Sequence, residues 1–257
     1  ERRAVALQIK AACEDIGFLI EEKALLEKNQ DEYPFGYTSI GGEILQEMFS
    51  IGPSNPAAGM PPRLFPSNPL SFADKWAAYY DALGGLAQVL LQAFALSLDL
   101  PENYFEEFTD HHASAMRALN YPVIDGYEPL PGQLRASPHT DYGVLTILRS
   151  GGPGLQVSKD REPPTWIDVP FVENAFVINL GDLMRRWTND RWQSTLHQVI
   201  NPPVGSGWGR RQSIAFFYNL NRDARVEVLG DEAPKYEPII AGDFLMQKHL
   251  ASMKAKK

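Results

Sequence analysis

Residues 138–148 read Pro-His-Thr-Asp-Tyr-Gly-Val-Leu-Thr-Ile-Leu, and the interpretation of the whole chain starts from them. They join a His-x-Asp triplet, His139-Thr140-Asp141, to an apolar segment that is typical of a buried strand. Side chains two positions apart in a strand point the same way, so we expect His139 and Asp141 to face one common site. An imidazole and a carboxylate placed together in this way are suitable metal ligands.

A second histidine and an Arg-x-Ser pair follow on later apolar segments. His197 begins one segment, and Arg211 and Ser213 open the next. Two imidazoles and one carboxylate on rigid strands are the ligands of non-haem Fe(II) sites, which leave further coordination positions open. A guanidinium beside a hydroxyl is suited to bind a carboxylate. The ordered set therefore predicts an iron site made by His139, Asp141 and His197, with an anion site beside it.

Simpler explanations exist for each residue alone, because an isolated His-x-Asp is more often a turn or a surface ion pair. We favour the metal-site interpretation over these explanations, because the His-x-Asp triplet, the second histidine and the Arg-x-Ser pair occur in this order on separate predicted strands. Adjacent histidines rarely converge on one ion, so we interpret His111 and His112 as surface residues, and we expect His249 to be solvated on a terminal helix. A second Arg-x-Ser, Arg135-Ala136-Ser137, is flanked by Gly and Pro. We expect a turn there, which makes Arg135 the weaker candidate for an anion site.

Composition excludes several classes of protein. The 257 residues carry a formal net charge of −8 and one cysteine. An acidic chain is a poor match for nucleic-acid phosphates, and one cysteine excludes an internal disulfide and a Cys-rich zinc module. No run approaches the roughly 18 apolar residues of a membrane span, and no signal peptide is visible. We expect a cytoplasmic monomer without nucleic-acid or membrane partners.

The hydrophobic pattern changes along the chain. Residues 1–114 are predicted to be mainly helical, with a long helix from Ser71, and residues 231–257 return to helix. Between them, residues 115–230 hold eight short apolar segments separated by turn residues. The segments are 117–121, 143–148, 154–157, 165–169, 175–178, 197–200, 213–218 and 226–228. We predict one domain over 1–257, mainly β with flanking α-helices, whose core is a barrel or jelly roll.

Two N-terminal stretches are unusual. The junction Ile20-Glu21 joins an apolar strand candidate to a charged helical segment without turn residues, and we interpret it as a place where residues are absent. Residues 52–69 contain six prolines. They form either part of a substrate lid, together with residues 37–42, or a loop that packs on the surface.

These segments together resemble the isopenicillin N synthase-like branch of the Fe(II)/2-oxoglutarate-dependent dioxygenases over nearly the whole chain. The matching stretches are 12–18, 116–122, 138–143, 154–157, 177–182, 187–189, 194–197 and 211–213. The resemblance implies a double-stranded β-helix (jelly-roll) core with iron on His139, Asp141 and His197. It also implies that Arg211 and Ser213 bind the distal carboxylate of 2-oxoglutarate.

Further site residues follow from the same resemblance. Tyr121, on the strand before the His-x-Asp strand, would contact the co-substrate. The family often has an asparagine where this chain has Leu119, so that hydrogen bond would be absent. Asn179 and Asp182 match positions that shape the turn before the distal histidine, and we interpret them as structural.

The implied reaction uses Fe(II), 2-oxoglutarate and O2 and releases succinate and CO2. It would hydroxylate, desaturate or cyclise an unactivated C–H of a small substrate, such as an amino acid or an intermediate of secondary metabolism. One alternative is an oxidase of the same fold that binds no 2-oxoglutarate and holds the carboxylate of its substrate with Arg211 and Ser213. A non-catalytic jelly-roll binding module is the third possibility, although it would be expected to lack a metal ligand.

Overall fold

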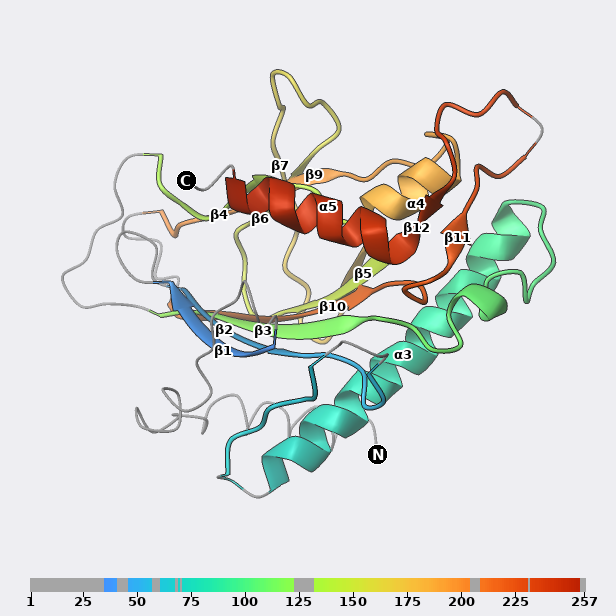
Figure 1. Ribbon diagram of the computed structural model, residues 1–257. Coiled ribbons are helices and arrows are strands. Elements are labelled where there is room, and N and C mark those ends of the chain that lie inside the picture. Colours follow the sequence, from blue (N-terminus) through green and yellow to red (C-terminus); the bar gives the residue numbers. More distant parts are fainter. Residues whose placement is uncertain are drawn as a thin grey trace.

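Two antiparallel sheets face each other in the computed structural model of the chain, and a long helix covers the outer side of the larger one (Figure 1). The structure describes residues 35–40, 46–56, 61–67, 69, 71–122, 132–203, 209–230 and 232–254. The predicted N-terminal helix, the strand candidate after it and the junction Ile20-Glu21 lie outside these residues.

The larger sheet has six strands in the order β1-β2-β3-β10-β5-β8. Their bounds are Gly36–Ile40 (β1), Gln46–Ile51 (β2), Ala115–Tyr121 (β3), Arg211–Tyr218 (β10), Leu145–Ser150 (β5) and Phe176–Leu180 (β8). The smaller sheet has the order β4-β9-β6-β7. Its strands are Leu134–His139 (β4), Leu196–Ile200 (β9), Leu155–Ser158 (β6) and Ile167–Asp168 (β7).

From β3 to β10 the chain passes back and forth between the two sheets, which is the winding of a double-stranded β-helix. The predicted fold class is therefore confirmed. Each of the eight predicted segments overlaps a strand, the last being β11 (Arg225–Val226), which pairs with β12 (Ile239–Ile240).

Three strands on which the core depends have no counterpart in the prediction. β1 and β2 lie in the part of the chain for which helices were expected, and β2 pairs with β3. The third, β4, reads Leu-Arg-Ala-Ser-Pro-His and lacks apolar alternation. Its pairing with β9 contains two register shifts, so the sequence pattern that marks a regular strand is missing there.

The long helix α3 (Ser71–Ser97) begins at the predicted residue and buries one side against the larger sheet (Figure 1). Its Trp76 ring lies 5.9 Å from that of Phe49, and its Tyr80 ring lies 5.0 Å from that of Phe216. The proline-rich loop contributes Phe65, whose ring lies 6.2 Å from that of Phe72. The described part of this loop thus packs against α3. No helix of the described residues is both long enough and apolar enough to cross a bilayer.

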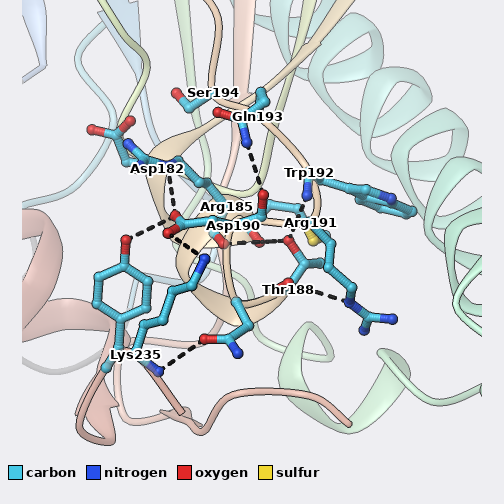
Figure 2. Close-up of polar contacts among 12 residues, drawn as sticks. Asp182, Arg185, Thr188, Asp190, Arg191, Trp192, Gln193, Ser194 and Lys235 are labelled. Carbon is cyan, nitrogen blue, oxygen red and sulfur yellow. Dashed lines mark hydrogen bonds and ion pairs between the residues drawn. The ribbon is translucent and has the colours of Figure 1, made fainter. Parts of the chain in front are cut away.

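A tight connection precedes β9, after the short helix α4 (Asp182–Trp187). Asp190, in a left-handed conformation with φ of 65°, accepts hydrogen bonds from Arg185 Nε and Tyr236 Oη, both at 2.8 Å (Figure 2). Lys235 Nζ lies 3.3 Å from its second oxygen. Burial alone would raise the pKa of Asp190, but these donors and the Arg185 charge lower it overall. The connection is thereby fixed to the segment before the C-terminal helix α5 (Ala241–Lys254).

Candidate active site

The two predicted histidine ligands lie on neighbouring strands of the smaller sheet. His139 ends β4 and is the register partner of His197 on β9, and their ring centroids are 4.2 Å apart. Asp141 lies in the connection from β4 to β5. The expectation that His139 and Asp141 lie two positions apart in one strand, at the start of the segment 143–148, is therefore wrong. His139 belongs to the preceding strand, and the chain turns between the two residues.

Hydrogen bonds on the far side of each ring orient the imidazoles. His139 Nδ1 lies 2.8 Å from the Ser137 carbonyl oxygen, and His197 Nδ1 lies 3.0 Å from that of Thr195. A carbonyl can only accept, so each Nδ1 donates to it, and Nε2 is the ring nitrogen left to face a shared ion. Each ring is therefore oriented through its Nδ1, as metal-bound histidines are.

The carboxylate of Asp141 is buried and held on one side only. Its Oδ2 accepts hydrogen bonds from Thr146 Oγ1 and Asn179 Nδ2, both at 2.7 Å. Its Oδ1 lies 3.7 Å from His197 Nε2. The three donor atoms lie within 4.8 Å of one another. Atoms that each bind one ion at about 2 Å are separated by roughly 3 to 4 Å, so the set fits a single divalent metal ion.

A carboxylate-binding group lies on the larger sheet, at the start of β10. Arg211 and Ser213 are buried on one face, and Arg211 Nη1 donates to Ser213 Oγ at 3.3 Å. Its other acceptors among the described residues are neutral: the Pro153 carbonyl oxygen at 3.2 Å and Ser150 Oγ at 3.1 Å. Burial lowers the pKa of Arg211, yet guanidinium pKa values are so high that the group stays charged.

The Tyr121 ring lies directly beside this arginine. Tyr121 is the register partner of Arg211, and the Arg211 Cζ is 5.7 Å from its ring centroid. Burial raises the pKa of Tyr121, so its hydroxyl is protonated at neutral pH. The hydroxyl oxygen accepts a hydrogen bond from Gln46 Nε2 at 3.0 Å, and among the described residues no acceptor is recorded for the phenolic proton.

Sequence reasoning missed some of the residues around the site. Asn179 was interpreted as shaping a turn, but it donates to Asp141 from β8. A polar residue inside the apolar run of β8 was the available signal. Arg135 was expected in a turn, but it lies on β4 and is buried. His112 was expected at the surface, but it stacks on Tyr80 at 6.0 Å. His111 is exposed, as expected.

Comparison with known proteins agrees with this geometry. The family model of the 2OG-Fe(II) oxygenase superfamily matches residues 113–220, which include all six predicted site residues. A 2-oxoglutarate-Fe(II) type oxidoreductase of Emericella nidulans is 33% identical over 253 residues, covering 88% of this chain and 71% of the relative. The validamycin A dioxygenase of Streptomyces hygroscopicus subsp. limoneus is 29% identical over 72% of this chain. The chain spans only about half of this relative and of several others.

Solved structures give the same result. A full-length Neurospora crassa protein, crystallised in complex with alpha-KG, superimposes with a TM-score of 0.87 at 29% identity, over 98% of this chain and 82% of the other. A 2OG-Fe(II) oxygenase family protein from Caulobacter crescentus superimposes with a TM-score of 0.85 at 26% identity, over 98% and 86%. The expected dioxygenase family, with its cofactors Fe(II) and 2-oxoglutarate, is therefore confirmed. The chain belongs to the 2OG-Fe(II) oxygenase superfamily.

Proposed function

We propose that this chain oxidises an unactivated C–H of a small organic molecule with O2, using Fe(II) bound by His139, Asp141 and His197 and 2-oxoglutarate as co-substrate. One observation carries the proposal: two imidazole nitrogens and one carboxylate oxygen converge from three segments of the fold and lie within 4.8 Å of one another. This is the donor set of a non-haem Fe(II) site with open coordination positions.

We assign the distal carboxylate of 2-oxoglutarate to Arg211, Ser213 and Tyr121. A planar guanidinium, a hydroxyl and a protonated phenol all donate hydrogen bonds to a carboxylate. When bound, the iron and the 2-oxo acid supply the oxidative chemistry, releasing succinate and CO2. The residues of the chain hold the two ends of the co-substrate and shield the reacting centre from water.

The substrate is proposed only as a class. One of the solved complexes of the Neurospora crassa protein contains thymine, and one relative is called a proline hydroxylase. Both names refer to small molecules, which supports a small-molecule substrate here. We further propose a cytoplasmic monomer without nucleic-acid or membrane partners. The net charge of −8 supports the absence of a nucleic-acid partner, and the single cysteine supports a reducing compartment.

The metal assignment is tested by measuring bound Fe(II) per chain under anaerobic conditions. We expect His139→Ala and Asp141→Ala to lose stoichiometric binding, because each removes one of three protein ligands. His249→Ala, on the C-terminal helix, is the matched control and should bind iron as the wild type does. Full iron occupancy in Asp141→Ala would contradict the assignment.

The co-substrate assignment is tested by succinate release from 2-oxoglutarate, with and without candidate small molecules. Arg211→Ala should mainly raise the KM for 2-oxoglutarate, because one buried charged contact is removed. An iron-loaded wild type that consumes O2 and a substrate but neither binds nor decarboxylates 2-oxoglutarate would instead support the oxidase alternative.

A further inference from the structure

A second arginine, Arg135, lies beside the proposed 2-oxoglutarate site. It comes from β4, four residues before His139, whereas Arg211 comes from β10 of the other sheet. The Arg135 Cζ lies 5.6 Å from the Tyr121 ring centroid, and the Arg211 Cζ lies 5.7 Å from it. The two positive charges are close enough for Arg135 to lower the pKa of Arg211. One tyrosine ring is thus shared by two guanidinium groups from different sheets.

Neither guanidinium has an anionic partner in the part of the chain that the structure describes. No ion pair there includes Arg135 or Arg211. Arg135 is only 8% exposed, and its one hydrogen bond to a described residue is a long contact of 3.4 Å from Nη2 to the Gly209 carbonyl oxygen. Most of its five N–H donors therefore have no acceptor among the described residues, and a buried charge without a counter-ion is costly.

A bound carboxylate would relieve this cost. One carboxylate offers two oxygens with about four lone-pair sites, enough for donors from two arginines and the Tyr121 hydroxyl. The carboxylate of Asp141 does not serve this purpose, because its Oδ2 is taken by Thr146 and Asn179 and its Oδ1 faces His197. Among the described residues no carboxylate is available for these donors, and a bound ligand can supply one.

We propose that Arg135 is a second binding residue for the distal carboxylate of the 2-oxo acid co-substrate, placed beside the Tyr121 ring together with Arg211. This inference rests on the proposed function and deepens it. The site is built from both sheets, so that the co-substrate is held by a positive charge on each. Arg135 also adds selectivity, because a 2-oxo acid without a distal carboxylate would leave two buried charges unpaired.

The test measures binding rather than turnover. The Mn(II)-loaded protein is titrated calorimetrically with 2-oxoglutarate and with 2-oxopentanoate, which has the same chain length but a methyl group in place of the distal carboxylate. We expect Arg135→Gln to raise the Kd for 2-oxoglutarate about tenfold and Arg211→Gln to raise it about a hundredfold. Neither variant should change the Kd for 2-oxopentanoate more than about threefold, because that ligand makes no contact with either charge.

Two further variants separate ligand binding from a structural role. Arg135→Lys keeps the charge and loses the planar fork, so it should bind 2-oxoglutarate between the wild type and Arg135→Gln. Arg225→Gln, at an exposed arginine paired with Glu227, is the matched control and should bind as the wild type does. The ligand-free melting temperature of Arg135→Gln should not fall below that of the wild type, because the variant removes a buried unpaired charge.

The outcomes are distinguishable. Arg135→Gln that binds 2-oxoglutarate like the wild type, or that loses affinity for both oxo acids equally, overturns the role of Arg135 while leaving Arg211 and the proposed function intact. A wild type that binds metal but neither oxo acid overturns the proposed use of 2-oxoglutarate, and the inference with it.

Discussion

Single hydrogen bonds decide which atoms of the site residues face the metal position. Each histidine is fixed by a backbone carbonyl two residues before it, Ser137 for His139 and Thr195 for His197. Because these acceptors are main-chain atoms, the orientation of both rings follows from the strand conformation itself. Asp141 is oriented instead by donors from β5 and β8.

The Thr146 hydroxyl is expected to tune metal affinity without touching the ion. Thr146→Val is nearly isosteric and leaves Asp141 Oδ2 with Asn179 as its only donor among the described residues. We expect Mn(II) affinity to fall about tenfold, as is typical when a group that orients a ligand is removed. Titration of Mn(II) followed by electron paramagnetic resonance measures this. Thr165→Val, at an exposed threonine, should leave the affinity unchanged, and an unchanged affinity in Thr146→Val would refute the role.

The partly buried His112 is expected to make the protein less stable in acid. Its ring contacts those of Tyr80 and Tyr218, and its Nδ1 has no hydrogen-bond partner among the described residues. Burial lowers the pKa of His112, although the charge of Asp81 opposes this. In the unfolded chain the His112 ring binds a proton near pH 6.5, whereas in the folded protein it does so only at lower pH. The neutral ring therefore contributes to the free energy of unfolding above about pH 6.5, and this contribution is lost as the pH falls through the pKa of His112 in the folded protein.

We therefore predict that His112→Phe, which keeps the aromatic contacts, loses less stability than the wild type between pH 7 and pH 5. Chemical denaturation at several pH values measures the free energy of unfolding. His111 gives a contrast of opposite sign, because hydrogen bonding to Asp110 raises its pKa. The contribution of protonated His111 to the free energy of unfolding is present at low pH and lost as the pH rises. His111→Phe lacks it and should therefore lose more stability than the wild type between pH 7 and pH 5. Parallel pH profiles for the wild type and His112→Phe would contradict the prediction.

At the scale of elements, the site depends on how closely two turns approach each other. The turn between β8 and α4 lies against the one between β4 and β5: Asp182 N donates to the Asp141 carbonyl oxygen at 2.8 Å. The Asp182 carboxylate also accepts hydrogen bonds from Thr140 Oγ1 at 3.1 Å and from Lys248 Nζ of α5 at 2.7 Å. Thr140, which lies between two of the proposed metal ligands in the sequence, is thus connected through Asp182 to the C-terminal helix.

Gly181 is required by this close approach. A Cβ atom there would lie 2.2 Å from the carbonyl oxygen of Gly143, which belongs to the backbone and cannot rotate away. We expect Gly181→Ala to lower the free energy of unfolding by at least about 2 kcal/mol and to weaken metal binding, because the two turns must separate. Gly85→Ala is the matched control: it lies in α3 with no atom within 4 Å of its Cβ and should stabilise the helix. Equal melting temperatures for the two variants would refute this explanation.

At the scale of the whole molecule, the site lies between the two sheets. His139 and His197 come from the smaller sheet, and Arg211 comes from the larger one. A metal ion and a 2-oxo acid bound together would therefore link the sheets as well as fill the site. Ligands that bind only the folded state stabilise it by mass action.

We predict that Mn(II) and 2-oxoglutarate together raise the melting temperature more than the sum of their separate effects. When the free concentration of one ligand is a hundred times its dissociation constant, binding adds about 2.7 kcal/mol to the free energy of unfolding. Differential scanning fluorimetry of the wild type and Asp141→Ala measures the shift, which should be absent in the variant. Equal shifts in both proteins would mean that the ligands bind elsewhere.

The sequence alone determined the chemistry and the type of fold. The sequence shows directly which residue types could bind the metal, and in which order they occur along the chain. The regular apolar segments are also a local property, because burial selects residue types position by position. The strands β3, β5 and β10 could be predicted on this basis. β4 could not, because its polar, proline-containing sequence carries no alternation and its pairing with β9 is irregular.

Only the tertiary structure decided which residues meet. Asn179 reaches Asp141 and Arg135 reaches Tyr121 because strands far apart in the sequence are brought together by the sheet topology. Such contacts depend on register and on the distance between the sheets, which no local pattern encodes. For this reason the three proposed metal ligands could be chosen from spacing and residue type, whereas the hydrogen bonds that orient them and the position of the second arginine could not be predicted.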